Sequence, residues 1–196
     1  MTKLMIASTL MLAAATALAG VAPGDKAPDF TLEDTAGQAH ALQKYLDEGH
    51  VVVLEWFNAD CPFIKKHHLN HKTMDETYQA VADQGVVWLA ICSSAEGKQG
   101  AGLERNQRAV AEYAMPFPVL MDTSGEVGKA YGAKTTPHMF VITADGEVAY
   151  AGAIDDDRSA GTLGKTNHVA AALQEVLAGK AVTVAETAPY GCSVKY

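Results

Sequence analysis

The chain has 196 residues, of which 48% are hydrophobic and 19% are charged, a balance typical of one folded globular domain with a short extension. Its formal net charge is −8 without a basic run, which argues against nucleic-acid binding. The three cysteines are too few for a disulfide scaffold, and their odd number leaves at least one thiol unpaired.

Residues 1–19 have the pattern of a secretion signal. Lys3 supplies the positive start, residues 4–18 form a short uncharged apolar run, and Ala17-Leu18-Ala19 fits the small residues before a cleavage site. The run is too short for a good membrane span. We therefore expect cleavage before Gly20, no membrane anchor afterwards, and export to the periplasm or the medium, where disulfides persist. The alternative is a buried first helix.

The rest of the chain alternates between predicted strands and helices. A hairpin is expected over 29–42, a helical turn over 42–46, strands over 51–57, 86–92, 118–121, 137–143 and 147–153, and helices over 61–84, 105–114, 124–131 and 167–178. The helix over 61–84 is predicted because side chains spaced three and four apart fall on one face: Ile64, His67, His71, Met74, Tyr78 and Val81.

Alternation of this kind predicts an α/β fold with a central mixed sheet flanked by helices. The predicted domain spans residues 20–179, begins with the hairpin, and is followed by a C-terminal tail, residues 180–196.

Cys61 is the first candidate for chemistry. It follows a buried strand and opens a helix, where the partial positive charge of the helix N-terminus favours a thiolate. Lys65 and Lys66 follow within two turns and could assist electrostatically. The alternative is an inert buried cysteine, but the placement predicts a reactive thiol.

A second signal is Thr136-Pro137 at the head of a predicted strand, where the peptide bond could be cis. The alternative is a trans proline on an edge strand. A third signal is the pair His67 and His71, whose spacing of four, with Cys61 nearby, could hold copper or another soft metal. The alternative for the histidines is packing at the edge of the core.

The Trp-Phe-x-x-x-Cys-Pro turn ending at Pro62, with Thr136-Pro137 and a strand hairpin farther along, resembles the thioredoxin fold. More narrowly, the chain resembles extracytoplasmic, peroxiredoxin-like (AhpC/TSA-related) redoxins over residues 23–196. The resemblance implies a redox-active thiol at Cys61 with a cis Thr136–Pro137 bond packed against it. The stretches that carry it are 58–67, 131–142, 150–156 and 189–196, the last ending in Gly-Cys-Ser-Val-Lys-Tyr.

The chain departs from two patterns of that family. Thioredoxins carry a second cysteine three residues after the first, where this chain has Ile64. Peroxiredoxins carry Thr or Ser three residues before the attacking cysteine and Pro seven before it, where this chain has Asn58 and Leu54. The exchange within one Cys-x-x-Cys motif and the hydroxyl that orients a peroxide are therefore both missing.

A second thiol must clear the mixed disulfide or sulfenic acid that Cys61 would form. Cys192 is one candidate, because a mobile tail of this length could fold back over Cys61 and the resembling branch shares the Gly-Cys ending. Cys92 is the other, because its strand is expected beside the strand over 51–57, although such a cysteine is more often a small packed hydrophobe.

These observations predict an exported thiol oxidoreductase without a cofactor, in which Cys61 attacks, Cys192 resolves, and the backbone at Thr136 and Pro137 aligns the sulfur or the substrate. The expected substrate is a protein disulfide, a thiol adduct or a hydroperoxide, and the expected partner is a thiol reductant. Two alternatives remain: a soft-metal binder using Cys61 with His67 or His71, and a redox-inert module locked by a Cys61–Cys192 disulfide, which could add about 4–5 kcal/mol of stability.

Overall fold

The computed structural model describes residues 20–196, so the predicted signal sequence, residues 1–19, lies outside the described residues. In chain order the elements are β1 (Thr31–Glu33), β2 (Ala39–Ala41), α1 (Leu42–Asp47), β3 (Val51–Trp56), α2 (Pro62–Lys65), the π-turn η1 (Lys66–Asn70), α3 (Thr73–Gln79), the 3₁₀ turn η2 (Ala82–Gln84), β4 (Val86–Cys92), α4 (Leu103–Tyr113), β5 (Val119–Met121), α5 (Glu126–Tyr131), β6 (Thr135–Thr136), β7 (Met139–Ile142), β8 (Val148–Gly152), α6 (His168–Leu177) and β9 (Cys192–Ser193).

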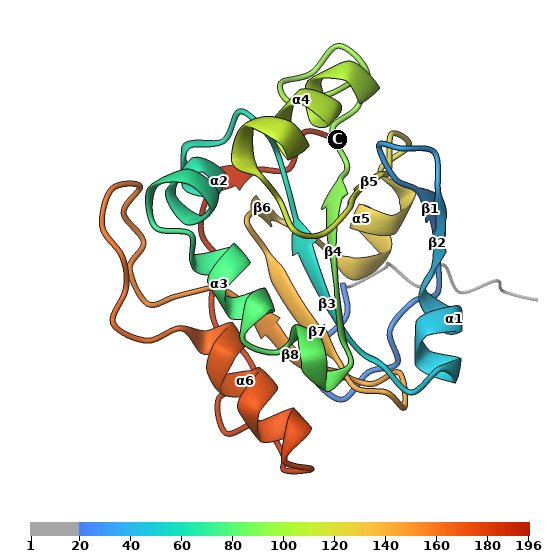
Figure 1. Ribbon diagram of the computed structural model, residues 1–196, viewed down its shortest axis with the longest axis vertical. Helices are drawn as coiled ribbons and strands as arrows, with labels where there is room; N and C mark the ends of the chain where they lie inside the picture. The colour runs from blue at the N-terminus through green and yellow to red at the C-terminus, as the bar shows by residue number, and fades with distance from the viewer. Residues whose placement is uncertain (1–19) are drawn as a thin grey trace, which may run out of the picture.

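A five-stranded mixed sheet in the order β5-β4-β3-β7-β8 forms the centre of the fold (Figure 1). β3, β4 and β5 are parallel, whereas β7 is antiparallel to both β3 and β8. Helical segments connect the parallel strands, and a tight turn at Gly146, which has a φ of 77°, connects β7 to β8. The predicted α/β fold is confirmed, with most element ends shifted by a few residues.

The residues of β3 alternate between two cores, as the two-residue period of a strand requires. Val53 packs in a cluster with side chains from α2, α3, α4 and α6. Its neighbours Val52 and Leu54 pack in a second cluster with side chains from α1 and α5. Both faces of the sheet are therefore covered. Among residues 20–196, no helix is long and apolar enough to cross a bilayer.

The single helix predicted over 61–84 is wrong, because the structure divides it into α2, η1, α3 and η2. Lys66, His67 and His68 are all buried, although three consecutive residues of a regular helix point in directions that span about 200° around its axis. A regular helix at the surface would therefore expose at least one of them. The π-turn at this place lets each side chain reach a buried partner. Lys72, with a φ of 54°, then separates η1 from α3. The predicted inward face is nevertheless confirmed at Ile64, His67, Met74 and Val81, which are all buried.

Candidate active site

Cys61 lies at the start of α2, directly beyond the carboxyl end of β3. Its extended backbone, with φ −75° and ψ 127°, makes it the N-cap residue, and Pro62 occupies the first helical turn. Asn58 fixes the loop that leads to it: its side-chain oxygen accepts from the backbone N–H of Asp60 at 2.9 Å, and its amide donates to the Gln99 carbonyl at 2.9 Å. The Cys61 side chain is therefore held in place and is 0% exposed.

Two groups contact the sulfur of Cys61. The thiol donates to the carbonyl oxygen of Thr136 at 3.0 Å, and the sulfur of Cys192 lies 3.0 Å away. The Thr136–Pro137 peptide bond is cis, which confirms that expectation. The three cysteines are free thiols in this structure. Closing a disulfide between Cys61 and Cys192 would need an approach of about 1 Å.

The pairing of β6 with β9 brings Cys192 to this position. The two strands are antiparallel, with Thr136 opposite Cys192 and Thr135 opposite Ser193. In Figure 1 the red C-terminal segment returns from α6 and forms β9 beside β6. The tail is therefore docked by backbone hydrogen bonds, which corrects the expectation of a mobile tail.

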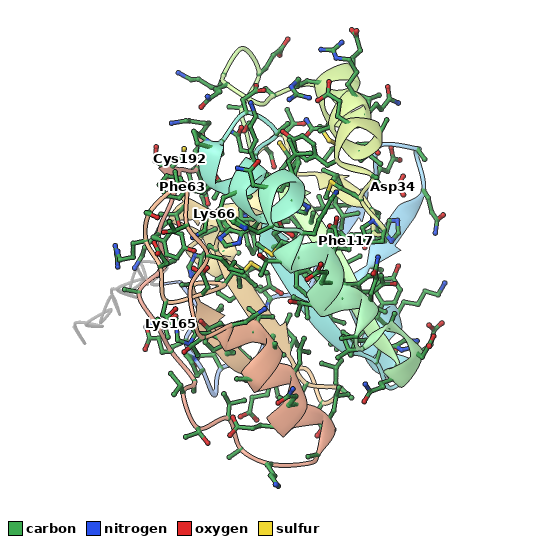
Figure 2. The ribbon with its side chains drawn as sticks, turned by 60° about the vertical axis from the view of Figure 1, so that its left-hand side comes forward. Asp34, Phe63, Lys66, Phe117, Lys165 and Cys192 are labelled. Carbon is green, nitrogen blue, oxygen red and sulfur yellow. The ribbon has the colours of Figure 1, made fainter. Side chains whose placement is uncertain are left out.

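A buried polar cluster anchors the tail two residues before Cys192. The phenol of Tyr190, which is 4% exposed, donates to the carboxylate of Asp155 and accepts from the ammonium of Lys66 at 3.2 Å. Lys66 is paired with Asp155 at 3.4 Å, with side-chain exposures of 0% and 1%. His67 Nε2 lies 3.0 Å from the same phenol, and Phe63 packs edge-on against its ring. Figure 2 shows Phe63, Lys66 and Cys192 on one side of the molecule.

Contacts on both sides of Cys192 hold the rest of the tail. Before Cys192, the Thr187 N–H donates to the Ala151 carbonyl of β8 at 3.1 Å, and the Ala151 N–H donates to the Ala185 carbonyl at 3.0 Å. Beyond Cys192, the Val194 N–H donates to the Lys134 carbonyl at 3.2 Å, and the Tyr196 phenol donates to the Ala133 carbonyl at 2.9 Å. Residues 187–196 of the tail therefore cross the site as a strap that is held by hydrogen bonds on both sides of Cys192.

The environment of Cys192 changes its acidity. Burial and the hydrogen bond to Cys61 raise the pKa of Cys192 to about 11, although the charge of Lys195 acts in the opposite direction. Cys192 is nevertheless partly exposed, unlike Cys61.

A second buried charged cluster joins η1 and α3 to the strands β3 and β4. The imidazole of His68 bridges the carboxylates of Glu55, at 2.7 Å, and Asp75, at 3.2 Å, and the indole of Trp88 donates to Glu55 at 3.1 Å. Burial alone would lower the pKa of His68, but the charge of Glu55 and the hydrogen bonds to Asp75 and Glu55 raise it to about 9. His68 is therefore an imidazolium at neutral pH.

The other sequence candidates lie apart from the sulfur pair. Cys92 is the last residue of β4, which pairs with β3 as expected. Its thiol nevertheless contacts the Gly100 carbonyl at 3.5 Å, and its side chain packs in the core. Burial raises the pKa of the Cys92 thiol. Lys65 is exposed, and Lys66, the other proposed helper, is turned toward Asp155.

The structure does not assemble the candidate metal site. His67 faces Tyr190, whereas His71 Nε2 lies 3.2 Å from the carbonyl of Gly161 in another loop. Within residues 20–196, no group of three or more His, Cys, Asp or Glu side chains could hold a metal ion.

Sequence reasoning missed Tyr190 and the cluster around His68. Tyr190 offered one signal, because residues two apart on an extended chain share a face and Tyr190 stands two before Cys192. Glu55 offered another, as the single charge in a strand buried on both faces.

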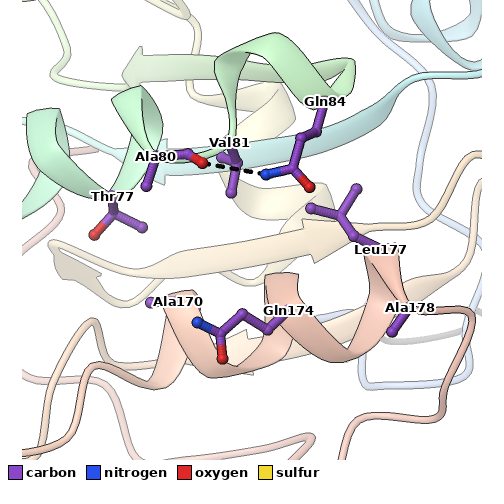
Figure 3. A pocket seen from close by; sticks show the side chains of 8 residues that line it. All are labelled: Thr77, Ala80, Val81, Gln84, Ala170, Gln174, Leu177 and Ala178. Carbon is purple, nitrogen blue, oxygen red and sulfur yellow. Dashed lines mark hydrogen bonds between the residues drawn. The ribbon is translucent and has the colours of Figure 1, made fainter.

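A groove of about 370 Å³ lies between α3 and α6, and the residues of the candidate site do not line it (Figure 3). Apolar and amide side chains and one hydroxyl line it, and neither Cys61 nor Cys192 is among them: the lining residues are Thr77, Ala80, Val81, Gln84, Ala170, Gln174, Leu177 and Ala178.

Replacing Gly191 by alanine is expected to displace Cys192 from Cys61. A Cβ at this position would lie 2.1 Å from the Thr136 carbonyl oxygen, and Gly191 has a φ of 137°. Strain of about 1–3 kcal/mol corresponds to a roughly 5–150-fold fall in the effective concentration of the Cys192 thiol at Cys61. Equilibration of the Cys61–Cys192 disulfide in glutathione redox buffers measures this concentration. Gly161→Ala is the matched control, because a Cβ there meets no atom of the described chain within 4 Å. Equal effective concentrations in both variants would contradict the prediction.

A mixed sheet covered by helices, with a cysteine after the central strand facing a cis-proline loop, defines a protein of the thioredoxin-like class. The sequence model of the family described as Redoxin matches residues 22–173. The chain therefore belongs to the Redoxin family, and it is an oxidoreductase.

Individual relatives agree with this assignment. A curated relative, the thiol-disulfide oxidoreductase ResA of Geobacillus thermodenitrificans, is 31% identical over 128 residues, which cover 65% of this chain and 67% of that protein. A hypothetical protein of Sinorhizobium meliloti has a solved structure with a TM-score of 0.81 and 30% identity, covering 90% of this chain and 96% of that one. An uncharacterized conserved protein of Geobacillus kaustophilus follows with a TM-score of 0.78 and 29% identity, covering 89% and 92% of the two chains.

Proposed function

We propose that this protein is an exported thiol–disulfide oxidoreductase whose redox pair is Cys61 and Cys192. The observation that carries the proposal is the 3.0 Å separation between the sulfur of Cys61 at the start of α2 and the sulfur of Cys192 on β9. The name of the ResA relatives, thiol-disulfide oxidoreductase, supports the reaction class. In place of a Cys-x-x-Cys motif, the second thiol comes from the tail.

The pair would cycle between a dithiol and an intramolecular disulfide. When the dithiol reduces a substrate disulfide, one cysteine forms a mixed disulfide with the substrate and the other displaces it, so that two electrons pass to the substrate. An unidentified thiol reductant would return the Cys61–Cys192 disulfide to the dithiol. No cofactor enters this cycle.

Thiol–disulfide exchange is favoured over peroxide reduction by the position of Asn58. Asn58 stands where the resembling peroxiredoxins carry a hydroxyl, and its amide is engaged by the Asp60 N–H and the Gln99 carbonyl. This side chain braces the loop and offers no hydroxyl to a peroxide.

Export rests on the pattern of residues 1–19, which ends in Ala17-Leu18-Ala19. N-terminal sequencing of the exported chain should begin at Gly20. A chain that keeps residues 1–19 in the cytoplasm would contradict export and would leave the redox chemistry unaffected.

The redox pair is tested by cysteine connectivity and activity together. Mass spectrometry of the oxidised protein should show a Cys61–Cys192 disulfide. Cys61→Ser and Cys192→Ser should each lower the rate of exchange with a peptide disulfide at least about 100-fold, because neither variant can complete the cycle. Cys92→Ala is the matched control and should retain the rate.

The reduction potential separates an active pair from a structural disulfide. An active pair should lie between about −120 and −270 mV, the range of thioredoxin-like exchange proteins. A potential below about −300 mV, with unchanged exchange in Cys61→Ser, would show a structural bond instead and would contradict the proposal.

A further inference from the structure

The two sulfur atoms of the pair differ in their access to solvent. Cys61 is 0% exposed and belongs to the core cluster that includes Phe57 and Ile64. Cys192 is partly exposed and is followed by the exposed Ser193 on a two-residue strand. Cys61 is therefore fully enclosed, with Cys192 beside its sulfur, whereas Cys192 keeps partial contact with solvent.

This difference matters because a thiolate attacks a disulfide sulfur from the side opposite the sulfur that leaves. Opposite Cys192, the Cys61 sulfur faces a buried environment. Cys192, in contrast, is only partly buried, so an approach from solvent has to be made at this residue. Closing the bond moves the sulfur atoms by only about 1 Å, so the same surroundings enclose the disulfide.

We propose that an external thiol enters the Cys61–Cys192 disulfide at the sulfur of Cys192, so that the mixed disulfide with the redox partner, a protein dithiol, forms on the tail. This inference rests on the proposed redox pair and specifies which sulfur meets the partner. It reverses the order expected from the sequence, in which Cys61 makes the first contact and Cys192 resolves.

The docking of the strap supports this route. Exposing Cys61 to a protein partner requires the tail to lift, which breaks the β6–β9 pair, the Tyr190 contacts with Lys66 and Asp155, and the hydrogen bond of Tyr196. Attack at Cys192 requires none of these changes.

The chemistry of the leaving group acts in the same direction. Attack at Cys192 expels the sulfur of Cys61, whereas attack at Cys61 expels that of Cys192. Burial raises the pKa of Cys192, and a thiol with a raised pKa is a poorer leaving group than an ordinary thiol. Lys195, whose charge reaches Cys192, also attracts an incoming thiolate.

The exchange balances in two displacements. First, a partner thiolate bonds to the Cys192 sulfur, the Cys61–Cys192 bond breaks, and Cys61 leaves with the electron pair and takes up a proton. The partner's second thiolate then attacks the partner sulfur of the mixed disulfide, and Cys192 leaves and is protonated. The chain is reduced to the dithiol, the partner is oxidised to a disulfide, and the two protons taken up equal those that the partner thiols lost.

The experiment traps the first mixed disulfide. Full-length oxidised protein carrying Cys92→Ala is mixed with a reduced thioredoxin whose second active-site cysteine is replaced by serine. N-ethylmaleimide caps the thiol that is released, and mass spectrometry locates both modifications. We expect thioredoxin on Cys192 and the maleimide on Cys61, in at least tenfold excess over the opposite arrangement.

Two outcomes separate this inference from the proposed function. A Cys61–Cys192 disulfide that carries thioredoxin mainly on Cys61 would overturn the inference and leave the redox pair standing. Failure to form that disulfide in the starting material would overturn both.

A tail variant checks the physical cause. Tyr190→Phe removes the phenol that contacts Lys66, Asp155 and His67, so the strap should lift more often and expose Cys61. The excess of Cys192-linked over Cys61-linked product should fall at least threefold. An unchanged ratio would show that tail docking does not direct the attack, and would overturn the inference.

Discussion

Replacing Lys66 by methionine is expected to lower the free energy of unfolding by about 3–5 kcal/mol, because it leaves the buried carboxylate of Asp155 without its cation. The Lys66 ammonium also donates to the carbonyl of Asp157 at 2.7 Å and to the phenol of Tyr190. Loss of the side chain therefore weakens both the core and the anchor of the tail. Urea denaturation of the reduced protein measures the change.

Lys65→Met is the matched control for this variant. Lys65 precedes Lys66 in the chain, is exposed, and forms no ion pair within residues 20–196, so its replacement should change the free energy by no more than about 0.5 kcal/mol. The double variant Lys66→Met with Asp155→Asn should recover part of the loss, because the unpaired charge is also removed. Equal stability of Lys66→Met and Lys65→Met would contradict a stabilising role for the buried pair.

Titration of His68 is expected to lower the free energy of unfolding by about 3 kcal/mol between pH 6 and pH 9.5. Burial opposes its charge, but Glu55 and Asp75 outweigh burial and raise the pKa of His68 from 6.5 to about 9. The native state therefore keeps a proton that the unfolded chain releases. This contribution is complete below about pH 6.5 and is lost as the pH rises through about 9.

Denaturation of His68→Gln across the same pH range isolates the contribution, because the difference from the wild type should shrink as the pH rises. His50→Gln is the matched control, since His50 is about one-third exposed and lies outside the cluster of Glu55 and Asp75, in contact with Glu48 and the Gly85 carbonyl. Where His68→Gln does not fold, Asp75→Asn should still reduce the slope by removing one of the two carboxylates that contact His68. If the free energy of unfolding of these variants depends on pH as steeply as that of the wild type, His68 is not the titrating group.

The two buried clusters meet at η1. Lys66 and His67 face the Tyr190 anchor, whereas the next residue, His68, faces the Glu55 carboxylate in the core. One short irregular segment therefore connects the stability of the core to the position of Cys192. A regular amphipathic helix would present only one of these two faces to buried partners.

Local patterns in the sequence were enough to predict the central features of the fold. Uninterrupted apolar runs such as 51–57 predict strands buried on both faces, and their alternation with helical periods predicts a mixed sheet. The same reasoning places Cys61 after the central strand. The cis bond at Thr136–Pro137, which the structure contains, was implied by the resemblance to redoxins, whereas the local pattern left cis and trans both open. These features depend on contiguous residues, and so they can be read from the chain itself.

The sequence by itself therefore determined the class of fold and the position of Cys61, whereas only the tertiary structure decided which thiol lies beside it. The sequence left Cys92 and Cys192 both open as partners. The β6–β9 pairing and the burial of Tyr190 against Lys66 and Asp155 place Cys192 there. The physical reason is that these contacts join segments far apart in the chain. Their geometry depends on the packed core between the segments, and the spacing of apolar residues within one segment does not specify it.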